Sequence, residues 1–332
     1  MDVTLRSLRF RAEREATWQR LDDLLTKIEK RSPRSLSDED MLAIPTLYRA
    51  TLSSLSVARA TSLDQALVDY LEALSARAYF FVYGTRTTLM QSVLEFFVRT
   101  WPDTVRRAWR ETVVAALIMV AGVVAAFFLV RADPAFFFSF VPGDLAGGRD
   151  PSATTETLRQ TLYGDLQPQE RSNLSVFAAF LFTHNAQISL FAFALGIAFC
   201  LPSVLLMAYN GTMIGAMLAV FGAHGLAVPF SAWLLVHGVT ELFAITLAGA
   251  AGIRIGWAVA FPGSLSRLQA AERAGREGGV MMIGVVIMLF VAGLLEGFAR
   301  QLVQADSARF GIAGASALVW LLFFYARRGG RA

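Results

Sequence analysis

A stretch of 80 residues with a single charged side chain constrains this chain more than any other feature. Within residues 174–253 the only Asp, Glu, Lys or Arg is Glu241. Charged residues make up 17% of all 332 positions, whereas an ordinary soluble domain carries roughly 25%. No soluble surface can be built from such a stretch, so it must face lipid. We therefore predict an all-α, polytopic membrane bundle that follows a polar helical N-terminal region.

About six transmembrane helices are expected, because an uncharged run of about 18 residues can cross a hydrocarbon core of roughly 30 Å. Polar residues divide the apolar sequence. Pro202 is expected to kink one helix, and Asn210 and Gly211 to make a turn. Residues 174–182 are expected to lie along the membrane interface, and His184 and Asn185 are expected to end this segment. The predicted spans are 113–130, 188–208, 212–223, 230–251, 280–298 and 311–325.

The span 212–223 is short enough to be either a crossing or a re-entrant hairpin. Loops rich in Lys and Arg stay on the cytoplasmic side. A crossing puts the loop 254–279, with four Arg and two Glu, on one side with the tail residues Arg327, Arg328 and Arg331. We therefore predict the crossing, with both termini and the loop 254–279 cytoplasmic and the net-acidic loop 131–173 extracytoplasmic.

The predicted cytoplasmic helical region covers residues 1–105, and the transmembrane domain covers 106–332. Four segments of the first region each have one apolar face, which suits a small antiparallel bundle; a partner-docking surface is the alternative role. Residues 1–111 contain 17 Lys or Arg and 15 Asp or Glu. Because no basic stripe stands out, no nucleic-acid partner is expected. The four segments are 5–31, a helix that starts at Ser37, 63–83 and 87–99.

Few residues of the predicted spans can carry chemistry. Glu241 and Glu296 are the only acids within them, and ionisable groups at membrane depth usually face the bundle interior or a cavity. His237 lies four residues before Glu241, hence on the same helix face. We predict a buried polar cluster, whose members are His237, Glu241, Asn210, Glu296, His184 and Asn185.

Three interpretations of the polar cluster remain open: interhelical hydrogen bonds that fix the packing, a pathway for protons, ions or a solute, and a metal-dependent intramembrane hydrolase. The last is the weakest, because one His and one Glu fall short of a zinc site and the sequence contains no H-E-x-x-H. The nucleotide-binding and hydrolase motifs G-x-x-x-x-G-K-[ST] and G-x-S-x-G are also missing from it. We therefore expect no catalytic residue, no cofactor and no metal.

Glycines recur at a spacing that permits close approach of helices. Small residues four apart allow backbone contact in lipid, where no hydrophobic drive brings helices together. Tight packing within the chain is the expected role, and an oligomer interface is the second. The candidates are the pairs Gly211 and Gly215, Gly252 and Gly256, and Gly293 and Gly297, together with Gly238 and Gly249.

Several of these residues belong to a succession of motifs, which are Phe182 to Asn185, then Tyr209-Asn210-Gly211 with Gly215, then His237-Gly238-x-x-Glu241, then Ala248 to Gly256. This succession resembles the stage II sporulation protein M (SpoIIM-like) family, in its long non-sporulation type. The N-terminal region is similar as well, so the resemblance covers nearly the whole chain. The family often has Pro where this chain has Val236, and a second Asn where it has His184.

The resemblance implies a non-enzymatic scaffold or assembly component of a cell-envelope complex in the bacterial cytoplasmic (inner) membrane. The partners it implies, besides the lipid bilayer, are membrane and cytoplasmic proteins such as a MoxR-type ATPase, von Willebrand A-domain proteins and RDD proteins. Homodimerisation through a glycine-lined face is a further expectation. The alternative function is a transporter or channel-like protein that uses Glu241, His237 and Glu296 as a pathway for a proton, an ion or a solute.

Overall fold

The computed structural model describes residues 3–31, 36–61, 64–83, 89–164, 174–299 and 303–326. All regular elements of this part of the chain are helices, as predicted. The chain divides into two compact units, Met1–Gln91 and Ser92–Ala332. The predicted boundary at 105/106 is therefore too late. The tail residues Arg327, Arg328 and Arg331 lie outside the described residues.

The first unit contains three long helices, α1 (Val3–Arg31), α2 (Asp38–Ala60) and α3 (Gln65–Tyr83). The Ser37 side chain caps α2 by accepting a hydrogen bond from the Asp40 amide at 3.2 Å, as the sequence predicts. Trp18, Leu21 and Leu71 are almost completely buried in the shared core. Arg77 of α3 pairs with Asp22 and Glu29 of α1, so the same helices are joined at their polar edge.

The predicted fourth helix, 87–99, does not belong to this small bundle. Its residues form α4 (Leu89–Glu95) and a π-helix, η2 (Phe96–Thr100), which runs directly into α5 (Trp101–Arg107). The reason is aromatic packing: Phe96 stacks on Trp101 with ring centroids 5.6 Å apart. Trp101 is buried against Phe324 near the end of the chain. Trp101 and Pro102 therefore begin a helix of the second unit.

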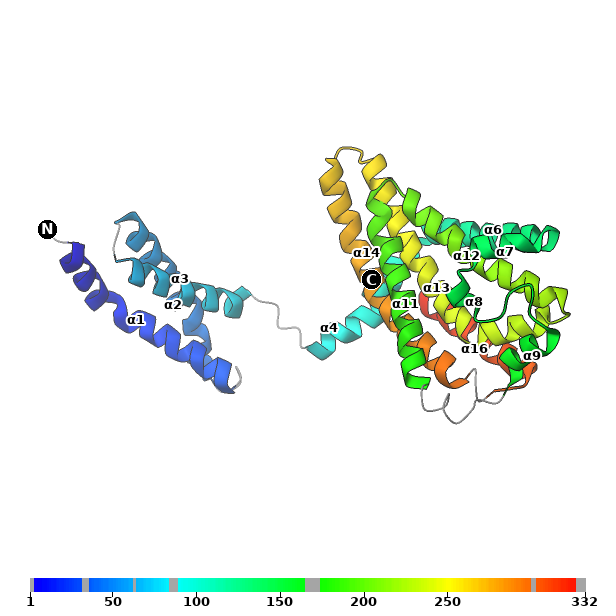
Figure 1. The fold of residues 1–332 in the computed structure, drawn as a ribbon. Helices are drawn as coiled ribbons and strands as arrows, with labels where there is room; N and C mark the ends of the chain where they lie inside the picture. Colours follow the sequence, from blue (N-terminus) through cyan, green and yellow to red (C-terminus); the bar gives the residue numbers. More distant parts are fainter. Residues whose placement is uncertain are drawn as a thin grey trace. The chain divides into compact units, whose positions relative to one another are not determined.

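Six long helices build the second unit (Figure 1): α6 (Trp109–Ala132), α11 (Leu174–Ala194), α12 (Leu201–Ala223), α13 (Ala227–Ala260), α14 (Arg267–Leu294) and α16 (Asp306–Tyr325). Within the described residues, five helices are long and apolar enough to cross a membrane: α6, α12, α13, α16 and the continuous helix from Arg267 to Gly297. α11 has 21 residues and carries no charge. Five candidate spans are thus established, and the sixth stays a prediction.

The turn between the second and third predicted spans lies elsewhere. α11 continues through His184 and Asn185, and α12 continues through Asn210 and Gly211. The chain turns at Phe199 and Cys200, which have φ of 56° and 67°. Asn210 stays helical because its side chain donates a hydrogen bond to the Leu206 carbonyl at 2.8 Å.

Two corrections follow from this turn. Pro202 lies in the first turn of α12, where its missing amide hydrogen costs nothing, so no kink arises there. The span 212–223 is the second half of one 23-residue helix, so the re-entrant alternative is excluded.

Contacts between helix ends define two ends of the bundle. At the first, which we call the Arg254 end, Arg254 of α13 pairs with Glu111 of α6 and Glu277 of α14. Arg106 of α5 donates a hydrogen bond to the Phe324 carbonyl at the end of α16. The start of α6, the end of α13, the start of α14 and the end of α16 therefore meet at this end.

At the opposite end lies the short helix α9 (Thr155–Tyr163), which is capped by the Thr154 side chain. Thr155 is hydrogen-bonded to His224, just after α12. Tyr163 donates a hydrogen bond to Asp306, which begins α16. We call this the α9 end, and successive helices run between the two ends in alternating directions.

α13 is the central helix of the bundle, and 72% of its apolar window is buried inside the molecule. It extends to Ala260, well past Arg254, so the predicted loop 254–279 shrinks to residues 261–266. Arg254 does not end the helix because Glu111 and Glu277 pair with it on the bundle side. The small residues around Gly249 and Gly252 let the other helices approach closely.

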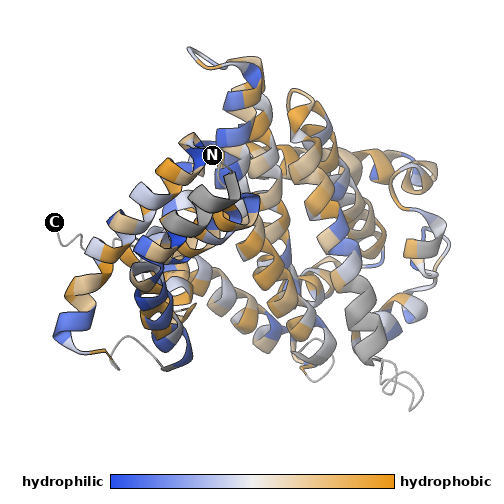
Figure 2. Cartoon of the chain, turned by 90° about the vertical axis from the view of Figure 1, so that its left-hand side faces the viewer, coloured by the Kyte–Doolittle hydropathy of each residue, from blue (hydrophilic) through white to orange (hydrophobic). Residues whose placement is uncertain are grey.

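The outward faces of the bundle are apolar. Figure 2 shows hydrophobic residues along most of the length of its helices. Leu117 of α6, Phe290 of α14 and Leu321 of α16 have exposed fractions of 63%, 59% and 56%. Only 17% of the apolar window of α16 is buried. Surfaces of this extent are not stable in water, so these faces contact lipid.

Most of the predicted packing glycines lie where helix backbones meet. A Cβ at Gly211 or Gly215 would strike a backbone carbonyl of α6, and one at Gly252 would strike the Ala192 carbonyl of α11. Gly256 is equally close to the backbone around Cys200, and Gly249 to the Met207 side chain. Intramolecular packing therefore explains these five glycines.

The other three predicted packing glycines differ. A Cβ at Gly238 would approach only side chains of its own helix, at 3.5 Å or more, so this residue is not a packing glycine. Gly293 and Gly297 lie at the end of α14 and in the π-helix η5 (Leu295–Ala299), and Gly297 is buried. Their packing role stays a prediction.

Candidate functional site

All six members of the predicted polar cluster line one cavity of about 320 Å³ in the second unit, which we call the Glu241 cavity. α11 contributes His184 and Asn185, α12 contributes Asn210, α13 contributes His237 and Glu241, and η5 contributes Glu296. Residues scattered over more than 110 positions of sequence are thus brought to one place. The rest of the lining is mostly apolar and includes Ile214, Met217 and Trp233.

The cavity lies toward the α9 end of the bundle. Glu241 precedes Arg254 by thirteen residues of continuous helix, which corresponds to about 20 Å along the axis. Val141, Leu145 and Arg149, from the segment that follows α6, line its wall. The cavity therefore sits within the apolar part of the bundle and is bordered by the segment at the α9 end.

His237, Glu241 and Glu296 form the core of the site. One ligand atom from each lies within 4.8 Å of the other two. The His237 Nε2 and Glu296 Oε1 atoms are 3.7 Å apart, and both side chains are more than 90% buried. The Trp233 ring packs edge-on against the His237 imidazole, with centroids 6.3 Å apart. The three side chains could therefore hold one small cation between them.

Local structure explains why these groups converge. His237 and Glu241 are four apart on α13, so both project from the same face. Glu296 lies in the π-helix η5 that follows α14. A π-turn widens the helix by one residue and is frequent at functional sites. Sequence reasoning placed Glu296 in the cluster but gave no sign of this widened turn.

Arg149 is the lining residue that sequence reasoning missed. Its Nε and Nη2 atoms donate hydrogen bonds to the carbonyls of Ala146 and Leu145, at 2.8 and 2.9 Å. Burial lowers the pKa of Arg149 from its usual value. No motif marks this residue, because it comes from an irregular segment and reaches the cavity only through the tertiary fold.

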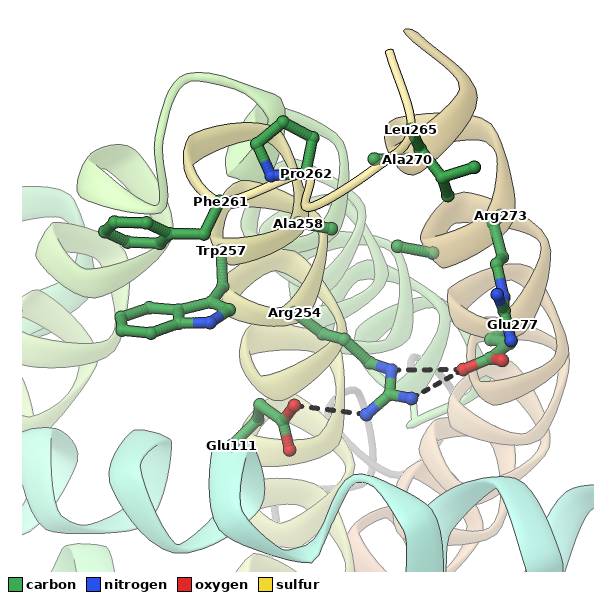
Figure 3. Close-up of a pocket in the computed structure, with 11 residues that line it drawn as sticks. Glu111, Arg254, Trp257, Ala258, Phe261, Pro262, Leu265, Ala270, Arg273 and Glu277 are labelled. Atoms are coloured by element: carbon green, nitrogen blue, oxygen red, sulfur yellow. Dashed lines mark hydrogen bonds and ion pairs between the residues drawn. The ribbon is translucent and has the colours of Figure 1, made fainter. Parts of the chain in front are cut away.

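A second pocket, of about 340 Å³, lies at the Arg254 end (Figure 3). Arg254 donates hydrogen bonds to Glu277 at 2.7 and 3.1 Å and to Glu111 at 3.1 Å. Trp257 and Phe261 project on the side away from α14. The two Arg and two Glu of the pocket balance in charge, which favours a structural role for it.

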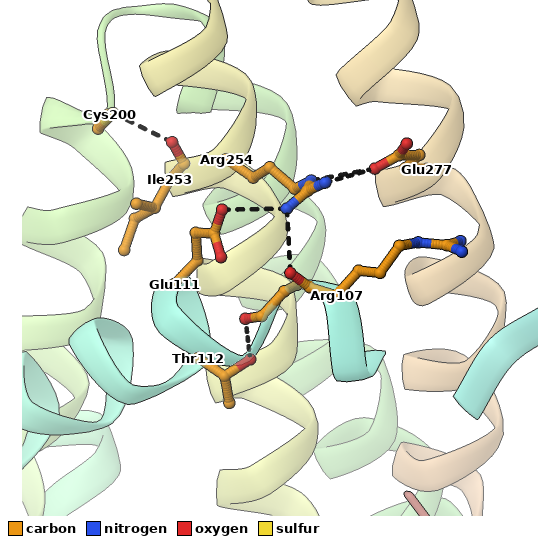
Figure 4. A network of polar contacts seen from close by, with 8 residues as sticks. Arg107, Glu111, Thr112, Cys200, Ile253, Arg254 and Glu277 are labelled. Atoms are coloured by element: carbon orange, nitrogen blue, oxygen red, sulfur yellow. Dashed lines mark hydrogen bonds and ion pairs between the residues drawn. The ribbon is translucent and has the colours of Figure 1, made fainter. Parts of the chain in front are cut away.

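The network around Arg254 reaches further (Figure 4). Arg254 also donates a hydrogen bond to the Arg107 carbonyl at 3.4 Å, and the Cys200 thiol donates one to the Ile253 carbonyl at 3.2 Å. α6, α13 and α14 are therefore tied together at the Arg254 end, and the turn before α12 is bonded to α13. Trp109, at the start of α6, is half exposed, and the Arg110 guanidinium lies over its ring.

Fold and site together define an integral membrane protein with a helical bundle. The sequence profile of the family described as stage II sporulation protein M matches residues 114–299. Because that match covers more than half of the chain, the chain belongs to this family. A second profile, a domain of unknown function (DUF8413), matches residues 8–84 in the first unit. No curated protein and no solved structure matches the chain significantly.

Proposed function

We propose that this chain is a non-enzymatic membrane protein that binds a small polar solute or a cation in the Glu241 cavity, as a transporter or channel-like protein does. One observation carries the proposal: six polar side chains from four elements line a single cavity inside an otherwise apolar bundle. Groups that only fix helix packing are expected to pair across closed interfaces. These groups border about 320 Å³ of space.

The energetic argument points the same way. Placing an ionisable group within the membrane costs several kcal/mol, so such groups mark pathways and binding sites more often than packing. Close packing of this bundle is supplied by glycines at other positions, such as Gly215 and Gly252.

Cysteine labelling tests whether the cavity admits water-soluble molecules. Cys200 is the only cysteine, so Cys200→Ser gives a background for Met217→Cys, at the cavity wall. We expect a membrane-impermeant maleimide to label it in proteoliposomes. Leu321→Cys, on the lipid-facing side of α16, is the unlabelled control, and Gln160→Cys, exposed on α9, is the labelled one. A wall position as unreactive as Leu321→Cys would contradict the proposal.

The second candidate function is a scaffold of a cell-envelope complex, and the two-unit architecture favours it. The first unit has its own core around Trp18 and Leu71 and its own family match, so a partner could bind it without the bundle. Co-purification of the full chain and of a chain lacking residues 1–91 distinguishes the candidates. A scaffold loses its partners with the first unit, whereas cavity labelling stays unchanged.

A further inference from the structure

The three ligand atoms of His237, Glu241 and Glu296 have nearly the spacing that a metal ion needs. Ligand atoms about 2.1 Å from one ion lie roughly 3.0–3.4 Å from each other in octahedral or tetrahedral geometry. The Nε2 of His237 and the Oε1 of Glu296 are 3.7 Å apart, and all three atoms fall within 4.8 Å. Rotamer adjustments of about 1 Å close that difference.

Charge also favours a cation at this position. Glu241 and Glu296 bring two carboxylates together in the apolar part of the bundle. Two like charges at such a distance repel each other strongly in a medium of low dielectric constant. A divalent cation between them balances both charges at once, which no neutral solute can do. Among the described lining residues Arg149 is the one Lys or Arg, and its guanidinium donates hydrogen bonds to the carbonyls of Ala146 and Leu145.

The donor set indicates which cation. One imidazole nitrogen and two carboxylate oxygens suit zinc and neighbouring first-row divalent ions, whereas Ca²⁺ prefers six to eight oxygen ligands. The cavity provides space for water at the remaining coordination positions. The edge-on contact of Trp233 with His237 restricts the orientation of the imidazole. A site with three protein ligands and open positions also leaves the ion exchangeable.

We propose that His237, Glu241 and Glu296 form a binding site for one first-row divalent transition-metal ion of the Zn²⁺ or Mn²⁺ class. This inference rests on the proposed function, because it names the ligand class of the same cavity. His237 contributes Nε2, and each glutamate contributes one carboxylate oxygen.

Metal titration of the purified full-length chain tests the inference. The protein in detergent is freed of metal with a chelator, dialysed against Zn²⁺ or Mn²⁺, and its metal content is measured by mass spectrometry. We expect one ion per chain, and no displacement by an excess of Ca²⁺. Glu296→Gln and His237→Gln should each weaken binding by more than about tenfold, because the loss even of a group that only orients a ligand costs about 10–100-fold in affinity.

Two matched variants separate the site from unspecific binding. His224→Gln removes a histidine that is bonded to Thr155 outside the cavity, and Glu272→Gln removes an exposed carboxylate of α14. Both should bind the metal as the unmodified chain does. Equal losses in these controls and in Glu296→Gln would overturn the site.

A measurement on the intact site covers the case in which Glu296→Gln does not fold. In Cys200→Ser/Met217→Cys, bound Zn²⁺ should slow maleimide labelling severalfold, whereas Ca²⁺ should not. If labelling occurs at the same rate with and without Zn²⁺ and no ion is bound, the metal inference fails while the cavity remains accessible. If labelling itself never occurs, the proposed function fails as well.

Discussion

The crossing of α6 and α12 provides the sharpest test of the packing. A Cβ at Gly215 would strike the Val123 carbonyl, and a Cβ at Gly122 would strike the Ala208 carbonyl in the other direction. Backbone atoms on both sides cannot rotate away, so Gly215→Ala must push the two helices apart. Overpacking of this kind costs about 1–3 kcal/mol, and the rigid contact favours the upper half of that range.

Gly222 on the same helix is the matched control. A Cβ there meets its nearest atoms at 3.8 Å, which is ordinary contact. Ala in place of Gly favours helix by up to about 1 kcal/mol at either position. That gain contributes to both variants, so the difference between Gly215→Ala and Gly222→Ala isolates the clash. We expect a difference of about 2 kcal/mol.

Thermal unfolding in detergent, followed by intrinsic fluorescence, measures this difference. For a domain of this size about 2 kcal/mol corresponds to roughly 4–8 °C in Tm. Gly222→Ala should match the unmodified protein or exceed it slightly, and Gly215→Ala should unfold several degrees earlier. If both variants have the same Tm, a Cβ at Gly215 does not clash with α6, and the close contact of α6 with α12 is contradicted.

Three further predictions concern the polar contacts. Arg254→Met should lower stability by about 1–3 kcal/mol, because it removes the cationic partner of two partly buried carboxylates. A double-mutant cycle with Glu277→Gln should give a coupling energy of about 1 kcal/mol, and additive effects of the two substitutions would contradict the pairing. Arg309→Met should lower stability more, by about 2–4 kcal/mol. The reason is that fully buried Arg309 donates hydrogen bonds to the Leu162 and Val303 carbonyls at 2.8 Å. An unchanged Tm in detergent would rule out this link between α9 and α16. Burial and the hydrogen bond to Asp306 raise the pKa of Tyr163. The contribution of Tyr163 to stability is therefore complete below its unfolded pKa of about 10 and is lost as pH rises through the raised folded pKa. The Tm of Tyr163→Phe should fall less steeply with pH at alkaline pH than that of the unmodified protein, and an identical slope would contradict this assignment.

The structural class of the protein can be predicted from local sequence. Membrane crossing depends on the length of an apolar run, so an 80-residue stretch with one charge suffices to predict a helical membrane bundle. The helix cap at Ser37 and the short helix at Thr155–Tyr163 were predictable for the same reason, since both depend on neighbouring residues. The members of the polar cluster could also be named, because an acid or histidine within a span almost always faces the bundle interior or a cavity.

Turns inside the apolar stretch could not be read from local signals. Asn210 and Gly211 predict a turn, yet both remain helical because Asn210 bonds to the Leu206 carbonyl and Gly211 allows α6 to approach. The fourth N-terminal segment was assigned to the wrong unit, because the aromatic contact of Phe96 with Trp101 lies within the membrane unit. At Gly211 and at Phe96, packing against a neighbouring element therefore outweighs the local preference.

From residue types and their spacing alone it follows that the region after Arg110 enters the membrane and that Glu241 needs polar neighbours there. The identity of these neighbours depends on the fold: Glu296 comes from a π-helix more than fifty residues away, and Arg149 comes from an irregular segment at the α9 end. The physical reason is that hydropathy is a sum over neighbouring residues, whereas a binding cavity depends on how distant helices are rotated and spaced. That rotation is set by backbone contacts at glycines such as Gly215 and Gly252.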